Sequence, residues 1–169
     1  YQSFSTFAGN PYFIDLEQLA GEGYLTLEEL EQYDFGSNPS YVDYERIYQV
    51  RYLILHKAFE NSPFASSPKG KWSDSRYNQD RYAFETYIKN NQEWLDDYAF
   101  YSALKGRFEN AAWIDWDEDI RLRRPEAMKK WHTELQSNIR FFCFIQYMFF
   151  RQWKAIKDYA AKHGIKILG

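Results

Sequence analysis

The pattern of apolar positions predicts helices along most of the chain. Ile47, Val50, Ile54 and Ala58 recur at steps of three or four residues, which places them on one face of a helix. Asp43 precedes this run and is a good N-cap residue. Apolar residues keep the same period in three later blocks. The expected helical blocks are residues 43–61, 74–90, 92–105 and 126–163.

Shorter sequence patterns add detail to these predicted helices. Residues 139–150 are apolar on most sides, so this part of the last block should be buried from several directions. Thr26 and Glu29 have the spacing of a capping box, which predicts a short helix. Tyr12–Ile14 and Ile165–Leu168 are short apolar runs beside turn residues, and we expect each to be a strand.

Composition and charge narrow the classes of function. A net charge of −3 argues against nucleic acid as a partner, and no apolar run has the length of a membrane span. Cys143 is the single cysteine, so no internal disulfide forms, which suits a reducing cytoplasm. His56, His132 and His163 are scattered, without acids or cysteines at ligand spacing. We therefore expect no metal and no cofactor.

Aromatic residues make up 21% of the chain, which fits two interpretations. Tyr and Trp combine a flat apolar face with a polar edge, and this suits stacking on sugars. It suits a core of large side chains equally, and composition alone favours the core. The aromatic and polar residues 1–10 are, on pattern alone, typical of a surface loop.

The opening run Tyr1-Gln-Ser-Phe-Ser-Thr-Phe-Ala-Gly-Asn-Pro-Tyr12 also carries a resemblance. It is similar to the N-terminal signature of the amylomaltases, the 4-alpha-glucanotransferases (disproportionating enzymes) of glycoside hydrolase family 77. Later blocks resemble family segments in the same order, so the resemblance covers the chain from end to end. These blocks are Trp94–Phe100, Trp113–Trp116 and Phe144–Trp153. Asp117 stands where the family usually has Pro, which predicts a different local turn.

The resemblance implies one part of a (β/α)8 barrel enzyme. The expected fold class is mainly α, a helical subdomain bracketed by two strands that would belong to the barrel. Residues 1–15 would form a barrel loop and strand, 16–124 a helical insertion subdomain, and 125–169 a long helical region followed by another barrel strand. A helical crossover would place the two strands close together and parallel.

The resemblance also implies chemistry that this chain does not complete. Family members retain anomeric configuration with a carboxylate nucleophile and a Glu general acid/base, which belong to segments beyond residue 169. We therefore expect no catalytic residue in this chain and no activity of the chain alone. Asp96, Asp97, Asp117 and Glu118 have the spacing of surface acids rather than of a retaining pair.

Two tyrosines match substrate-binding positions of the family. Tyr1 matches a residue that lines the sugar subsite next to the cleaved bond, and Tyr48 matches one of a second glucan site away from the cleft. Without the resemblance, Tyr48 would be interpreted as a half-exposed helix aromatic. The implied partners are α-1,4-glucans and the rest of the parent barrel. Apolar surface left uncovered would favour self-association.

A second hypothesis, from another class, stays open at this point. The chain could be a non-catalytic helical module that binds glucan or a protein partner through Tyr-rich surface. A barrel-completing strand and catalytic carboxylates on a continuing chain would favour the transferase. Glucan binding without turnover would favour the module.

Overall fold

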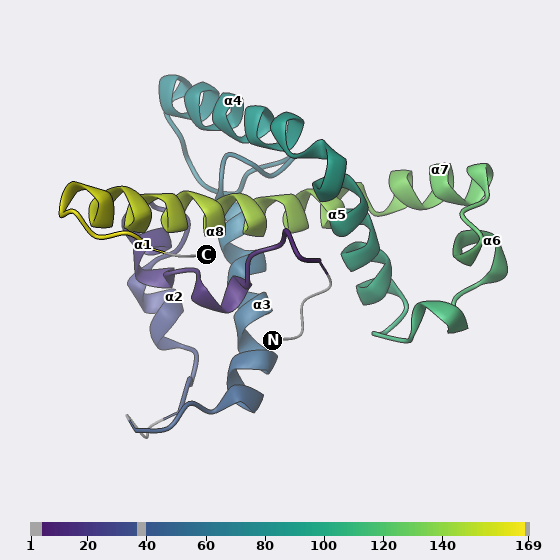
Figure 1. The fold of residues 1–169 in the computed structure, drawn as a ribbon, viewed down its shortest axis with the longest axis horizontal. Coiled ribbons are helices and arrows are strands. Elements are labelled where there is room, and N and C mark those ends of the chain that lie inside the picture. The colour runs from purple at the N-terminus through teal and green to yellow at the C-terminus, as the bar shows by residue number, and fades with distance from the viewer. Residues whose placement is uncertain (1–4, 37–39, 168–169) are drawn as a thin grey trace.

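The structure, a computed structural model, describes residues 5–36 and 40–167. Every regular element in these ranges is helical, and none of the described residues is in a β-strand, which confirms the prediction of a mainly α chain (Figure 1). In chain order the elements are η1 (Pro11–Phe13), α1 (Leu16–Gly21), α2 (Leu27–Glu31), α3 (Tyr44–Asn61), α4 (Asp74–Asn90), α5 (Gln92–Arg107), η2 (Trp113–Asp115), α6 (Glu118–Arg121), α7 (Pro125–Glu134) and α8 (Gln136–Lys162).

Helix α8 is the axis of the main body, which we define as α1 to α5 packed on α8. It runs through the main body, and α3, α4 and α5 contact it along its length (Figure 1). Phe141, Phe144 and Met148 are fully buried on it. Phe64, from the loop after α3, packs its ring 5.0 Å from Phe84 and 5.7 Å from Phe144. The predicted burial of this segment from several directions is confirmed.

The ends of the helices follow local capping chemistry. Thr26 and Glu29 form the predicted capping box, with Thr26 Oγ1 accepting from the Glu29 N–H at 3.1 Å and Glu29 Oε2 accepting from the Thr26 N–H at 2.9 Å. Asp43 accepts from the Arg46 N–H at 3.1 Å, as predicted for an N-cap. The long last block is broken at Leu135, between α7 and α8. The block predicted at residues 126–163 is therefore two helices rather than one.

The strands expected near the two ends of the chain are not formed, which corrects the sequence prediction. The Tyr12–Ile14 region is a turn of 3-10 helix, because the Phe13 N–H donates to Asn10 O (3.1 Å) and the Ile14 N–H to Pro11 O (3.2 Å). Residues 165–167 have no regular structure, and Leu168 lies outside the described residues. A strand needs a neighbouring strand to take its hydrogen bonds, and none of the described residues supplies one.

A smaller unit, the outer lobe, consists of the C-terminal half of α5 with η2, α6 and α7. It lies to one side of the main body, at the N-terminal end of α8 (Figure 1). Its core is a separate cluster in which the rings of Phe108 and Trp116 stack 5.2 Å apart. The Trp131 ring lies 5.5 Å from Phe108 and joins α7 to this stack. The outer lobe thus has its own aromatic core on the flank of α5.

Candidate functional site

Two buried glutamines of α8 hold the backbone of the N-terminal segment. The Gly9 N–H donates to Gln146 Oε1 at 2.8 Å, and Gln146 Nε2 donates to Gly9 O at 3.0 Å. The Asp15 N–H donates to Gln152 Oε1 at 2.7 Å, and Gln152 Nε2 donates to Asp15 O at 3.1 Å. Each side-chain amide therefore satisfies both peptide groups of one residue, as a neighbouring strand would. We call these four residues the glutamine clamp.

Other contacts fix the same segment from further directions. The guanidinium of Arg51, on α3, donates to Tyr12 O at 3.1 Å and also to Ile14 O. Gly9 lies so close to Phe149 that an added Cβ would come within 1.9 Å of the ring. Residues 9–15 are thus held both by α3 and by α8.

The structure describes one of the two predicted glucan-binding tyrosines. Tyr48 lies on α3 with 61% of its surface exposed. Tyr44, one helical turn earlier, is 69% exposed, so the two rings share one face of the helix. Tyr1 lies outside the described residues. A solvent-facing aromatic pair on a rigid helix can cover the apolar face of a sugar ring.

The acidic residues singled out in the sequence lie on the surface. Asp97 pairs with Arg123 at 2.9 Å, and Glu118 pairs with Arg124 at 3.0 Å. Asp96 and Asp117 are exposed. A retaining glycosidase places two carboxyl groups about 5 Å apart across a sugar in a closed cleft. Exposed carboxylates paired with arginines are typical of surface ion pairs, and the absence of a catalytic residue stays a prediction.

Buried titratable groups supply no activated nucleophile at the clamp. Burial raises the pKa of the Cys143 thiol to about 12, which keeps it protonated as a packed core group. Burial also raises the pKa of Tyr98, whose hydroxyl accepts a hydrogen bond from Gln146 Nε2 at 3.3 Å. The clamp therefore works through neutral hydrogen bonds, and its geometry positions backbone rather than activates a side chain.

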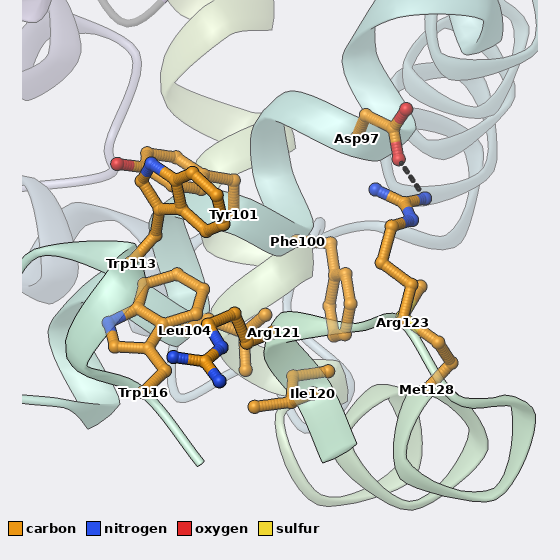
Figure 2. Close-up of a pocket in the computed structure, with 10 residues that line it drawn as sticks. All are labelled: Asp97, Phe100, Tyr101, Leu104, Trp113, Trp116, Ile120, Arg121, Arg123 and Met128. Carbon is orange, nitrogen blue, oxygen red and sulfur yellow. Dashed lines mark hydrogen bonds and ion pairs between the residues drawn. The ribbon is translucent and has the colours of Figure 1, made fainter. Parts of the chain in front are cut away.

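Two apolar hollows open on the surface. One, the aromatic pocket, has a volume of about 320 Å³ and lies between α5 and α6, with Tyr101, Trp113 and Trp116 on one side and Phe100 on another (Figure 2). The other, the α8 groove, has a volume of about 720 Å³ and lies beside the C-terminal half of α8. The apolar residues that line the groove are Phe13, Phe149, Trp153, Ala155, Ile156 and Tyr159.

Residues 5–36 and 40–167 hold neither a cluster of metal ligands nor a membrane-spanning helix. No group of three or more His, Cys, Asp or Glu side chains in these ranges could hold a metal ion. No helix there is both long enough and apolar enough to cross a membrane.

Comparison with known proteins shows the family to which the chain is related. The family model described as 4-alpha-glucanotransferase matches residues 1–169. The chain belongs to the 4-alpha-glucanotransferase family. It is 40% identical over 169 residues to the 4-alpha-glucanotransferase of Clostridium butyricum, with 100% of this chain and 32% of that protein covered. It is 38% identical to the Thermus thermophilus enzyme, covering 31% of it.

A solved structure of this family agrees with the fold. The chain is similar to the amylomaltase from Streptococcus agalactiae in complex with acarbose, with a TM-score of 0.82 and 31% identity over 98% of this chain. The match covers 31% of that structure. The chain therefore spans about a third of the length of the 4-alpha-glucanotransferases that it matches.

The glutamine clamp was not found from the sequence, although a signal for it was present. Gln146 interrupts the most apolar stretch of the chain, and Gln152 follows it by six residues. A buried polar side chain is costly unless it is hydrogen-bonded, so a glutamine in such a stretch indicates a specific partner. The sequence does not reveal that the partner is the backbone at Gly9, 137 residues away.

Proposed function

We propose that this chain is part of a 4-alpha-glucanotransferase that moves α-1,4-glucan segments between maltooligosaccharides with retention of configuration. The catalytic carboxylates belong to the rest of the enzyme. The observation that carries this proposal is the family match over residues 1–169, with relatives named 4-alpha-glucanotransferase at 38 and 40% identity.

In this proposal the chain supplies positioning and binding rather than chemistry. The glutamine clamp holds residues 9–15 and so directs the segment that carries Tyr1 to the sugar subsite next to the cleaved bond. Tyr48 stacks on a glucan away from the cleft. The clamped segment and the segment after Gly164 adjoin the barrel of the full-length enzyme. The domain boundaries at residues 15 and 124 separate the barrel parts of the chain from the helical insertion subdomain.

The α8 groove is the surface that the rest of the barrel covers. Phe13 and Tyr159 are each 67% exposed and Ile156 is 54% exposed, an unusual concentration of apolar surface on one side of a helix. Burying this surface against barrel elements would stabilise both. The chain by itself would instead associate with other copies through the groove. The single buried thiol, Cys143, suits a reducing cytoplasm as the site of action.

Incubation with maltotriose tests the proposed function. A protein that carries this chain at the full length of its relatives should convert maltotriose into glucose and a ladder of longer oligomers, because another glucan takes the transferred unit. The 169-residue chain alone should give no products. Release of glucose without longer oligomers would indicate a hydrolase and contradict the proposal. Glucan binding without turnover by the full-length protein would favour the non-catalytic module.

A matched pair of variants locates the role of the chain in the full-length protein. Tyr48→Ala should weaken the binding of long glucans while leaving the turnover of maltotriose nearly unchanged, since a second site away from the cleft does not touch the reacting bond. Tyr82→Ala is the control, because Tyr82 is 77% exposed on a different helix, α4. Equal effects of the two substitutions would remove Tyr48 from the glucan-binding surface.

A further inference from the structure

A second hollow adjoins the aromatic pocket along α5. This hollow, the polar pocket, has a volume of about 370 Å³, against about 320 Å³ for the aromatic pocket. Both volumes lie within the range of about 300–1,000 Å³ that is typical of small-molecule sites. Asp97, Tyr101 and Arg123 line both pockets, so the two share a wall. The residues that line only the polar pocket are Ser5, Glu93, Trp94 and Tyr98.

The aromatic pocket presents flat rings to solvent. Trp113 is 53% exposed, an unusual exposure for so large an apolar side chain. The Tyr101 and Trp116 rings lie 5.5 Å apart, and Trp116 is fixed by donating its indole N–H to Ala111 O at 3.3 Å. In Figure 2 the Tyr101, Trp113 and Trp116 rings gather on one side of the pocket. Trp113 and Tyr101 form an aromatic platform, and the buried Trp116 ring of the outer lobe's core supports it.

Charged groups stand where the two pockets meet. The guanidinium of Arg123 donates to Asp97 Oδ1 at 2.9 Å, as the dashed line in Figure 2 shows. Arg123 has a φ of 53° because it is the left-handed residue that ends α6. Its N–H donates to Ile120 O at 2.9 Å, and the Arg124 N–H donates to Asp119 O at 2.8 Å. This helix cap fixes the backbone from which the Arg123 side chain reaches Asp97.

We propose that the aromatic and polar pockets together bind one α-1,4-glucan chain, at a site additional to Tyr48. The identity of the ligand rests on the proposed function. A glucan offers apolar faces of C–H groups and a rim of hydroxyls. Trp113 and Tyr101 cover its faces, while Asp97 accepts from its hydroxyls and Arg123 donates to them.

The polar pocket gives this site a direction. Its wall at Ser5 belongs to the N-terminal segment, four residues after Tyr1, the residue that resembles the tyrosine next to the cleaved bond. The segment is held against α5 there, since the Phe7 and Trp94 rings stack 6.2 Å apart. A glucan that lies across the shared wall contacts the polar pocket and the aromatic platform together. The site thus favours long glucans over short ones.

A titration with maltoheptaose tests the site. The 169-residue chain is prepared with Tyr48→Ala, so that binding at that position is removed, and the indole N–H signals of its 6 tryptophans are followed by NMR. The Trp113 and Trp116 signals should shift with the sugar. Trp72 and Trp153, which line neither pocket, should not shift.

Two substitutions in that background define the contact. Trp113→Ala should weaken binding, read from the Trp116 signal, by about tenfold, since truncating a central aromatic contact typically has this effect. Ile114→Ala is the matched control, because Ile114 is the next residue of η2, is 55% exposed and does not line the pocket. Equal weakening by both substitutions would overturn the proposal.

Other outcomes separate this site from the proposed function. Unchanged Trp113 and Trp116 signals, while the full-length protein makes a ladder from maltotriose, would overturn the site and leave the transferase standing. Shifts without transfer would support the site and contradict the transferase. An equal response to a β-1,4-linked glucan of the same length would overturn the assignment to α-1,4-glucans. Shielding of Trp113 from acrylamide in the sugar-free full-length protein would overturn the site in favour of a protein contact.

Discussion

In the main body, α8 is covered by α3, α4 and α5, whereas in the outer lobe a row of aromatic rings joins α5 to the short helices α6 and α7. The main body buries large side chains completely, among them Phe64, Phe84 and Phe144. The outer lobe leaves Trp113 and Leu122 more than half exposed. Large apolar side chains thus form a completely buried core in the main body, whereas in the outer lobe a small core at Trp116 and Trp131 adjoins half-exposed rings such as Trp113.

This difference matches what each region can contribute to binding. Groups that must hold a backbone path within a fraction of an ångström need a rigid support, and the glutamine clamp is anchored in the buried face of α8. A surface that takes chains of varying length benefits from exposed rings on a unit with fewer neighbours. In the proposed function the main body therefore positions the N-terminal segment, and the outer lobe offers the glucan contact area.

The largest effect should follow from removing a ring at the centre of the main body. Phe144→Ala should lower the free energy of unfolding by about 3–5 kcal/mol, because it leaves a cavity lined by aromatic rings that cannot collapse. Urea denaturation followed by circular dichroism measures this change. Tyr159→Ala is the control on the same helix, since Tyr159 is 67% exposed, and it should cost far less. Equal losses of unfolding free energy in the two variants would mean that the buried face of α8 contributes no more to stability than its exposed face.

The next largest effect should come from the glutamine clamp. Gln146→Leu leaves the N–H and the C=O of Gly9 without their partner, and each unsatisfied group costs about 1–3 kcal/mol. We expect a loss of about 2–6 kcal/mol of stability, together with faster hydrogen exchange across residues 5–15. Gln136→Leu is the control, because Gln136 is exposed on the same helix. A loss of stability no greater than that of the control would show that water satisfies the Gly9 N–H and C=O when Gln146 is removed.

A substitution in the core of the outer lobe should unfold that lobe locally and leave the main body folded. Trp131→Ala removes the ring that joins α7 to Phe108, so α6 and α7 should lose protection from hydrogen exchange while α8 keeps it. The free energy of global unfolding should change much less than in Phe144→Ala. Peptide-resolved exchange by mass spectrometry distinguishes the regions. Loss of protection throughout α8 would mean that lobe and body unfold as one unit.

The sequence predicted these two regions unevenly, for physical reasons. Helical period and capping chemistry are local, so α3, α4, α5 and the Thr26 capping box could be predicted. The Tyr12–Ile14 strand was wrong because strands depend on distant partners. Here a 3-10 turn takes the N–H groups of Phe13 and Ile14, and Arg51 donates to the carbonyl oxygens of Tyr12 and Ile14. The aromatic pocket could not be predicted, since it needs the turn that brings Trp113 back to α5. Family resemblance supplied Tyr48, which no local pattern distinguishes from other exposed aromatics.

The smallest effect concerns the pH dependence of the main body. His56 stacks on Phe141 at 3.5 Å, and burial lowers its pKa, with Glu60 opposing in part. The unfolded chain, with a histidine pKa of about 6.5, therefore binds the proton more readily than the folded chain. The stabilising contribution of neutral His56 is fully present above that pH and declines as pH falls from there through the lowered pKa of the folded state.

Urea unfolding in steps from neutral to mildly acidic pH should show this decline in stability, and His56→Gln should flatten it. His163→Gln, an exposed control, should leave it in place. A decline that persists in His56→Gln would assign the effect to other groups.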